Sequence, residues 1–255
     1  MFMRETKCVA RVFSVAVCVG LLGGCMSVST VKEVMSDQPA YLSKHFTIAT
    51  LSPNLLKKLP ADSIQPAQKP LVLLAEVDYE GVDGKKETWQ NKVTFTDLGQ
   101  GIFQYVAEAS SNDIPFKVNY GLNYRGLIDL RWQNVPLVRG MTDPLVEVKD
   151  IKRFDALPSA ENQEFTVEFL SGNEIRLANF IEARRSCKAT RLLAAADIHK
   201  KLEGKALEME CQMFVENLLD SRGKWVFLQN YGIAIQTEEV ATRRKAVFRV
   251  VDVGG

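Results

Sequence analysis

The sequence predicts a mainly β (α+β) protein in which antiparallel sheets form a sandwich or a barrel-like body, with a helical insert near 175–203. Two observations lead to this prediction. Apolar and polar residues alternate along residues 127–132 and again along 165–169, which is the period of strands with one wet side. Asp83-Gly84 lies in the short gap between two strand-like runs, as in a tight hairpin, because glycine accepts positive φ.

Ten runs with strand character follow one another along the chain. They cover 71–79, 88–97, 102–106, 116–124, 127–132, 145–148, 165–169, 206–215, 225–235 and 246–253. In the run 127–132, Leu127, Asp129 and Arg131 are expected on one face of the strand, and Ile128, Leu130 and Trp132 on the other. Tyr120 and Tyr124 share a face of the preceding run, which suits either packing or an aromatic binding platform.

The region 175–202 is the main helical candidate. Its leucines and alanines favour a helix, and Gly204 would end it. Ser186, Cys187 and Thr190 are residues that would interrupt this helix.

The first 25 residues have the organisation of a targeting segment. Arg4, Lys7 and Arg11 precede an apolar run over 12–22, and Gly23-Gly24-Cys25 follows. As a helix, this run of 11 residues would rise only about 16 Å, against roughly 30 Å of hydrocarbon, so it is too short to span a bilayer.

This small-small-Cys ending resembles the lipobox of bacterial lipoproteins. The resemblance implies that 1–24 is a signal peptide and that Cys25 becomes the first residue of the mature chain, carrying acyl chains such as palmitate. It also implies a lipid-anchored protein of the cell envelope. Met26, which is not aspartate, favours the outer membrane, at its periplasmic face or at the cell surface.

Prolines suggest how the remaining chain is divided. Pro60, Pro66 and Pro70 form a stiff, extended connector. We therefore expect a lipidated N-terminus and tether over 25–69, a β-rich module over 70–158, and a second β-rich module with the helical insert over 159–255.

Two cysteines remain in the mature body, Cys187 and Cys211. An even pair in an oxidising compartment favours a disulfide, and two buried free thiols are the alternative. A zinc site is disfavoured because the only histidines are His45 and His199 and no Cys-x-x-Cys spacing accompanies them. No metal and no cofactor are expected.

The charge of the mature chain argues against nucleic acid as a partner. Removing 1–24 leaves 29 basic and 30 acidic residues, a net charge of about −1, with no basic tail. A local basic patch remains, either as a site for an anionic partner or as a solvated face: Arg184, Arg185, Lys188, Arg191, Lys200 and Lys201.

No residue set with catalytic spacing stands out, and no catalytic residue is predicted. His199 has Asp197 only two positions away, and on a helix such side chains do not face each other. No Gly-x-Ser-x-Gly elbow is present, and the acidic run from Asp78 to Asp83 fails the register of a calcium loop.

The leading functional hypothesis is therefore a non-catalytic interaction or assembly module that faces the periplasm and contacts another envelope protein. One alternative is a carrier of a small apolar ligand in a β-lined cavity, and a second is an envelope hydrolase. A carrier needs a cavity of roughly 300–1,000 Å³, whereas an interaction module has a filled core.

Overall fold

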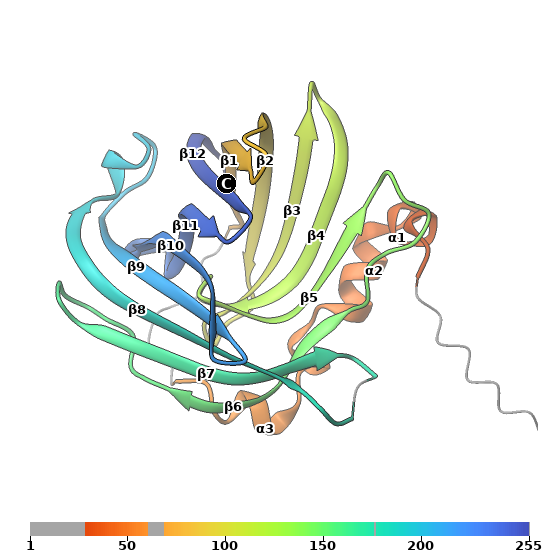
Figure 1. The fold of residues 1–255 in the computed structure, drawn as a ribbon, viewed down its shortest axis with the longest axis horizontal. Coiled ribbons are helices and arrows are strands. Elements are labelled where there is room, and N and C mark those ends of the chain that lie inside the picture. The colour runs from red at the N-terminus through yellow and green to blue at the C-terminus, as the bar shows by residue number, and fades with distance from the viewer. Residues whose placement is uncertain (1–28, 61–68, 176, 255) are drawn as a thin grey trace, which may run out of the picture.

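The computed structural model describes residues 29–60, 69–175 and 177–254, and these form one closed antiparallel barrel (Figure 1). Each of twelve strands pairs with its neighbour in the chain, and β12 pairs with β1. The strands are β1 (Leu71–Gly81), β2 (Lys86–Asp97), β3 (Ile102–Ser111), β4 (Ile114–Tyr124), β5 (Ile128–Pro136), β6 (Val146–Phe154), β7 (Glu164–Asn173), β8 (Ile181–Ala194), β9 (Lys205–Val215), β10 (Leu218–Leu228), β11 (Ile233–Ala241) and β12 (Arg244–Gly254). The predicted mainly β class with a barrel-like body is confirmed. The two stretches predicted as modules contribute consecutive strands to this single barrel.

The barrel wall consists of two sheets that join along two short seams. β5 and β6 pair only at Arg131–Glu147 and Trp132–Val146, and β11 pairs with β12 only over 238–241 and 244–247. β12 and β1–β5 therefore form one sheet, and β6–β11 form the other. Their inner faces enclose the barrel interior.

The predicted helical insert is wrong, because residues 181–194 form strand β8. The buried residues Ala183, Cys187 and Ala189 are spaced by even numbers, so they share one face of a strand. β8 pairs along most of its length with both β7 and β9. This pairing outweighs the helix propensity of its alanines and leucines. Only the short 3₁₀ turn η2 (Ala195–Asp197) follows it.

The Cys187–Cys211 disulfide is confirmed. The two cysteines are direct partners on adjacent strands β8 and β9, with Cα atoms 4.0 Å apart. The bond therefore joins neighbouring strands within one sheet.

The segment expected to be a tether is instead folded from Ser29 to Pro60. It contains α1 (Val31–Ser36), α2 (Gln38–His45), the 3₁₀ turn η1 (Ile48–Thr50) and α3 (Pro53–Leu56). Thr30 and Glu33 cap α1 reciprocally, and Asp37 caps α2. Polar residues therefore begin two helices in this segment.

Helices α1 and α2 lie against the outer face of the first sheet, and α3 lies beside β6 (Figure 1). Phe46 and Leu55 are buried in one cluster with Tyr120, Leu122 and Tyr124, the outward residues of β4. The backbone oxygens of His45 and Phe46 accept hydrogen bonds from Arg131 Nε (2.9 Å) and Gln104 Nε2 (2.7 Å). Tyr120 and Tyr124 thus serve packing and form no exposed platform.

The turn between β4 and β5 crosses the barrel and contacts β11. The Ala234 N–H donates to the Arg125 oxygen (2.8 Å), and Arg125 Nη1 donates to the Gly232 oxygen (2.8 Å). Gly126 has φ +68°, and a Cβ there would lie 2.0 Å from the Ala234 oxygen. A glycine is required here on both counts.

We expect Gly126→Ala to lower the free energy of unfolding by about 3 kcal/mol, from positive φ and overpacking together. Gly99→Ala is the matched control, since Gly99 has φ +86° and nothing within 4 Å of its Cβ position. That control should cost only about 1 kcal/mol. Urea denaturation of both variants measures the difference, and equal losses would contradict the close approach to β11.

Candidate functional site

A cavity of about 200 Å³ lies inside the barrel between the two sheets. Its walls come from β1–β5, β8 and β10–β12 and from the β4–β5 turn. Most of its lining is apolar or aromatic: Leu73, Ala75, Val93, Phe95, Ala107, Trp225, Ala234, Ile235, Phe248 and Val250. Seven other residues complete the lining: Asn91, Tyr105, Asn123, Gly126, Asp129, Arg185 and Gln236. Such a cavity suits a ligand with an apolar body and a polar group.

Asp129 is the central polar residue of this cavity. It lines the cavity and keeps exposed surface. Burial among protein atoms raises the pKa of its carboxyl group, and the positive charge of Arg185 and a hydrogen bond with Tyr105 oppose that rise. The Tyr105 hydroxyl has its pKa raised by burial and then by the Asp129 charge. It therefore stays protonated and acts as a donor.

Arg185 is the second charged group of the cavity. Its guanidinium lies over the Trp225 ring, 4.7 Å from the ring centroid, and Nη1 donates to the Leu127 oxygen. Burial lowers the pKa of Arg185, while Asp129 and Glu239 oppose this shift. Because the two charges balance, the cavity suits a neutral ligand that can both donate and accept hydrogen bonds.

Asp129 and Arg131 were expected on the same face of the strand, and this expectation is wrong. Leu122 pairs with Arg131 but Asn123 pairs with Asp129, so a bulge leaves Leu130 unpaired. Asp129 therefore faces the cavity, while Arg131 faces outward and is buried beneath the N-terminal helices. The sequence alone does not indicate that Tyr105, Asp129 and Arg185 form a cluster, because they come from three different strands.

The raised pKa of Asp129 gives a pH prediction. The stability that the Asp129 carboxyl contributes is complete below its unfolded pKa of about 3.9 and is lost as pH rises through its higher folded pKa. Asp129→Asn should remove this loss in urea denaturation measured from pH 4 to 7. Asp155→Asn is the contrast, because Arg153 lowers the pKa of Asp155 and its contribution is lost as pH falls. Stability–pH curves for wild type and Asp129→Asn that run parallel would contradict the raised pKa.

A surface hollow of about 560 Å³ adjoins the cavity and shares Phe95 with it. Leu71, Phe103, Ile233 and Val253 provide its apolar wall. The hollow therefore lies next to the cavity, and Phe95 lines both spaces.

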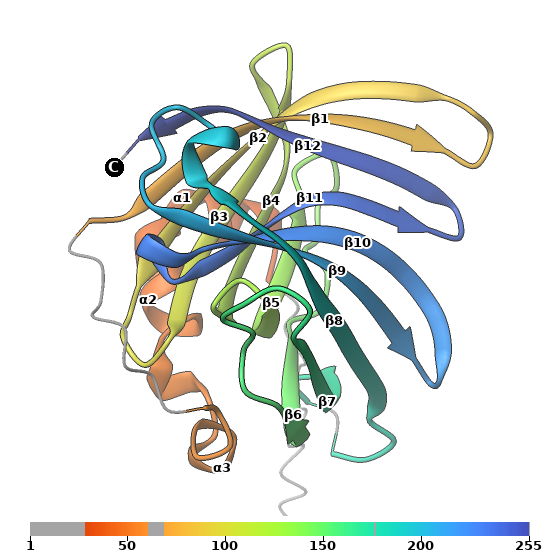
Figure 2. The ribbon, with the colours of Figure 1, turned by 90° about the vertical axis from the view of Figure 1, so that its left-hand side faces the viewer.

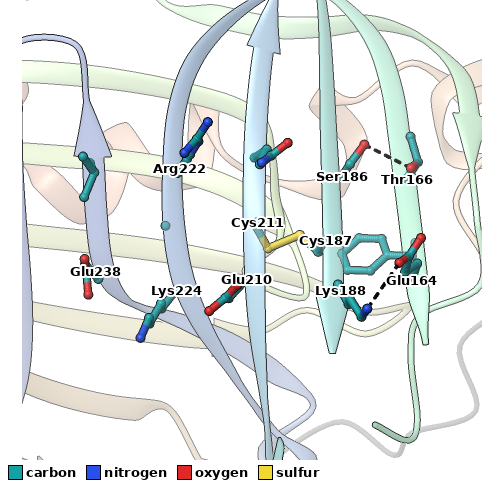
Figure 3. Close-up of a pocket in the computed structure, with 14 residues that line it drawn as sticks. Glu164, Thr166, Ser186, Cys187, Lys188, Glu210, Cys211, Arg222, Lys224 and Glu238 are labelled. Carbon is teal, nitrogen blue, oxygen red and sulfur yellow. Dashed lines mark hydrogen bonds and ion pairs between the residues drawn. A yellow bond between two sulfur atoms is a disulfide. The ribbon is translucent and has the colours of Figure 1, made fainter. Parts of the chain in front are cut away.

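A separate groove of about 590 Å³ crosses the outer face of β7–β11 (Figure 3). One of its edges is a row of alternating charges on successive strands: Glu164, Lys188, Glu210, Lys224 and Glu238. Lys188 and Glu164 form an ion pair of 3.9 Å, and Thr166 and Ser186 on the other edge hydrogen bond at 3.1 Å. Since neighbouring strands balance these charges, we assign this groove to sheet pairing.

The predicted basic patch is dispersed in the structure. Arg185 points into the barrel, whereas Arg184 lies over the Phe214 ring on the outer face. Three members form ion pairs: Lys188 with Glu164, Arg191 with Glu208 (3.4 Å) and Lys201 with Asp252 (2.7 Å). Lys200 lies exposed after η2. The six residues do not form one basic face.

His199 also lacks a catalytic arrangement with its sequence neighbour. Asp197 accepts a hydrogen bond from the Ala194 N–H (3.2 Å), and His199 Nδ1 accepts one from the Lys201 N–H (3.3 Å). Across the described ranges, no group of three His, Cys, Asp or Glu side chains is placed to hold a metal ion.

Comparisons with known protein families, curated proteins and solved structures find no match to this chain. No helix within the part of the chain that the structure describes is long and apolar enough to cross a membrane. The predicted signal peptide and the acylated Cys25 lie outside the described residues.

Proposed function

We propose that this protein binds a small, mainly apolar ligand inside its barrel, and that acyl chains on Cys25 hold it at a bacterial membrane. The observation that carries the proposal is the interior cavity, in which apolar walls surround Tyr105, Asp129 and Arg185. Convergent polar groups in an apolar pocket fix the orientation of a bound ligand.

The size of the cavity limits the ligand. A cavity of about 150 Å³ accepts benzene, so about 200 Å³ suits a ligand slightly larger than that. The ligand should carry one neutral polar group that donates to Asp129. A larger ligand would also occupy the adjoining hollow beyond Phe95.

By itself the cavity, at about 200 Å³, is smaller than the roughly 300–1,000 Å³ expected of a carrier, and it reaches that size only together with the adjoining hollow of about 560 Å³. Its polar groups are what favour a carrier over the interaction module expected from the sequence. A module that only contacts a partner would have no need of polar groups that converge on a hollow interior.

Two features support the membrane location and the compartment. The basic head, the apolar run and Gly23-Gly24-Cys25 resemble a lipoprotein signal, and Met26 favours the outer membrane. The Cys187–Cys211 disulfide is typical of an oxidising space such as the periplasm.

Titration with p-cresol tests the binding proposal, because this molecule has an apolar ring and one hydroxyl. We expect saturable binding by isothermal titration calorimetry. Toluene should bind roughly tenfold more weakly, because a hydrogen bond to a charged group contributes about 1.5 kcal/mol or more.

Ala107→Phe should abolish p-cresol binding, because Ala107 is a buried residue of the cavity wall. Ala196→Phe, at an exposed position in η2, is the matched control and should bind as wild type does. Circular dichroism establishes that both variants are folded. Unchanged binding to a folded Ala107→Phe variant would refute the interior site.

A further inference from the structure

One end of the barrel collects the turns that follow the odd-numbered strands. In a closed antiparallel barrel whose strands follow chain order, these turns must lie at the same end. Figure 2 shows the β1–β2, β7–β8, β9–β10 and β11–β12 turns along the right-hand side of the molecule. The turns after even-numbered strands lie at the other end. One of them, the β4–β5 turn, borders the cavity.

The exposed large apolar residues gather at the first of these ends. Among the described residues, ten of twelve lie in or beside its turns: Val82, Ile114, Val138, Met141, Ile175, Leu177, Ile181, Leu218, Leu219 and Val240. The other two, Leu192 and Val251, lie toward the far ends of β8 and β12. Exposed apolar side chains on the turns of one end suit contact with a membrane surface. We call this surface the apolar end.

The N-terminal segment is fixed to the apolar end. Thr30 forms a β-bridge with Met141, and the Val31 N–H donates to the Gly140 oxygen (3.1 Å). The Ser29 oxygen accepts from the Thr142 N–H (3.2 Å). Only three residues separate Cys25 from Ser29, so even a fully extended chain reaches about 14 Å. Acyl chains on Cys25 would therefore hold the β5–β6 turn close to the bilayer surface.

We propose that the apolar end lies on the membrane, with its turn tips in the headgroup region. This orientation rests on the proposed acylation of Cys25. It directs the opposite end of the barrel, with the β4–β5 turn and the hollow beside Phe95, toward water. The ligand would then enter from the aqueous side and not from the lipid.

Tryptophan probes in the acylated full chain test this orientation. Val138→Trp and Leu218→Trp place the probe at two turns of the apolar end, and Val251→Trp is the control toward the other end. Each variant is reconstituted into phosphatidylethanolamine–phosphatidylglycerol vesicles with brominated acyl chains, and its emission is compared with that of wild type. We expect the added emission at 138 and 218 to be blue-shifted and quenched by bromine, and that at 251 to be neither.

The outcomes separate the orientation from the anchor on which it depends. Flotation and mass spectrometry of wild type and Cys25→Ser report acylation. A wild-type chain whose mass includes no acyl chains overturns both the proposed anchor and the proposed orientation. An acylated, floating chain with unquenched probes at 138 and 218 overturns the orientation alone. Blue-shifted emission without quenching would mean that a protein surface, such as a second copy, covers the apolar end, and this also overturns it.

Discussion

Replacing Arg131 by methionine should lower the free energy of unfolding by about 3 kcal/mol, the lower end of the range for a broken buried ion pair. The Arg131 side chain is only 5% exposed and contacts both Glu147 and Glu174, the latter at 2.5 Å. Its Nε also donates to the His45 oxygen, which fastens α2 to the barrel. Glu147 and Glu174 keep some contact with water, which limits the loss. Urea denaturation at neutral pH measures the change.

Arg249→Met is the matched control for this variant. Arg249 also contacts two carboxylates, Glu76 at 2.5 Å and Asp78 at 2.6 Å, but its side chain is half exposed. We therefore expect only a small change in stability, because solvent screens such pairs. In Arg131→Met the Glu147 carboxylate would keep its ion pair with Lys149 at 2.7 Å, which also limits the loss. Equal losses for Arg131→Met and Arg249→Met would contradict the buried role of Arg131.

Removing the disulfide, as in Cys187→Ala with Cys211→Ala, should cost about 3–4 kcal/mol by the chain-entropy model. The two cysteines are 24 residues apart in sequence, so the bond closes a loop that is free in the reduced, unfolded chain. Urea denaturation with and without dithiothreitol measures the effect. Wild type should lose stability on reduction, and the double variant should not respond.

A thiol assay supplies the control, because it shows whether both cysteines have been reduced. A fully reduced wild type that unfolds at the same urea concentration as the oxidised protein would contradict the stabilising role. A loss on reduction in the double variant would point to an effect of the reductant unrelated to this bond.

The strand pattern was predictable because burial alternates along single strands. Leu71, Leu73, Ala75 and Val77 are buried at alternate positions of β1, and Phe165, Val167 and Phe169 repeat this in β7. Helix-forming residues concealed β8, because its conformation depends on pairing with β7 and β9. Non-local pairing of that kind leaves no local signal.

The candidate site was less predictable than the fold. Asp129 and Arg131 share a face in an ideal strand, and one bulged residue sends them to opposite faces. Tyr105, Asp129 and Arg185 meet only after the barrel closes, since they lie on β3, β5 and β8. The disulfide was predictable because two cysteines have only one possible pairing.

The most direct test of the internal ligand site is a crystal soaked in 4-bromophenol, which has nearly the shape of p-cresol and an anomalous scatterer. We predict one strong bromine peak inside the barrel, with the phenol hydroxyl within hydrogen-bond distance of Asp129 and the ring among Ala107, Phe248 and Val250. Bromine only in the outer groove across β7–β11, or none in the barrel at saturating phenol, would contradict a ligand-binding interior.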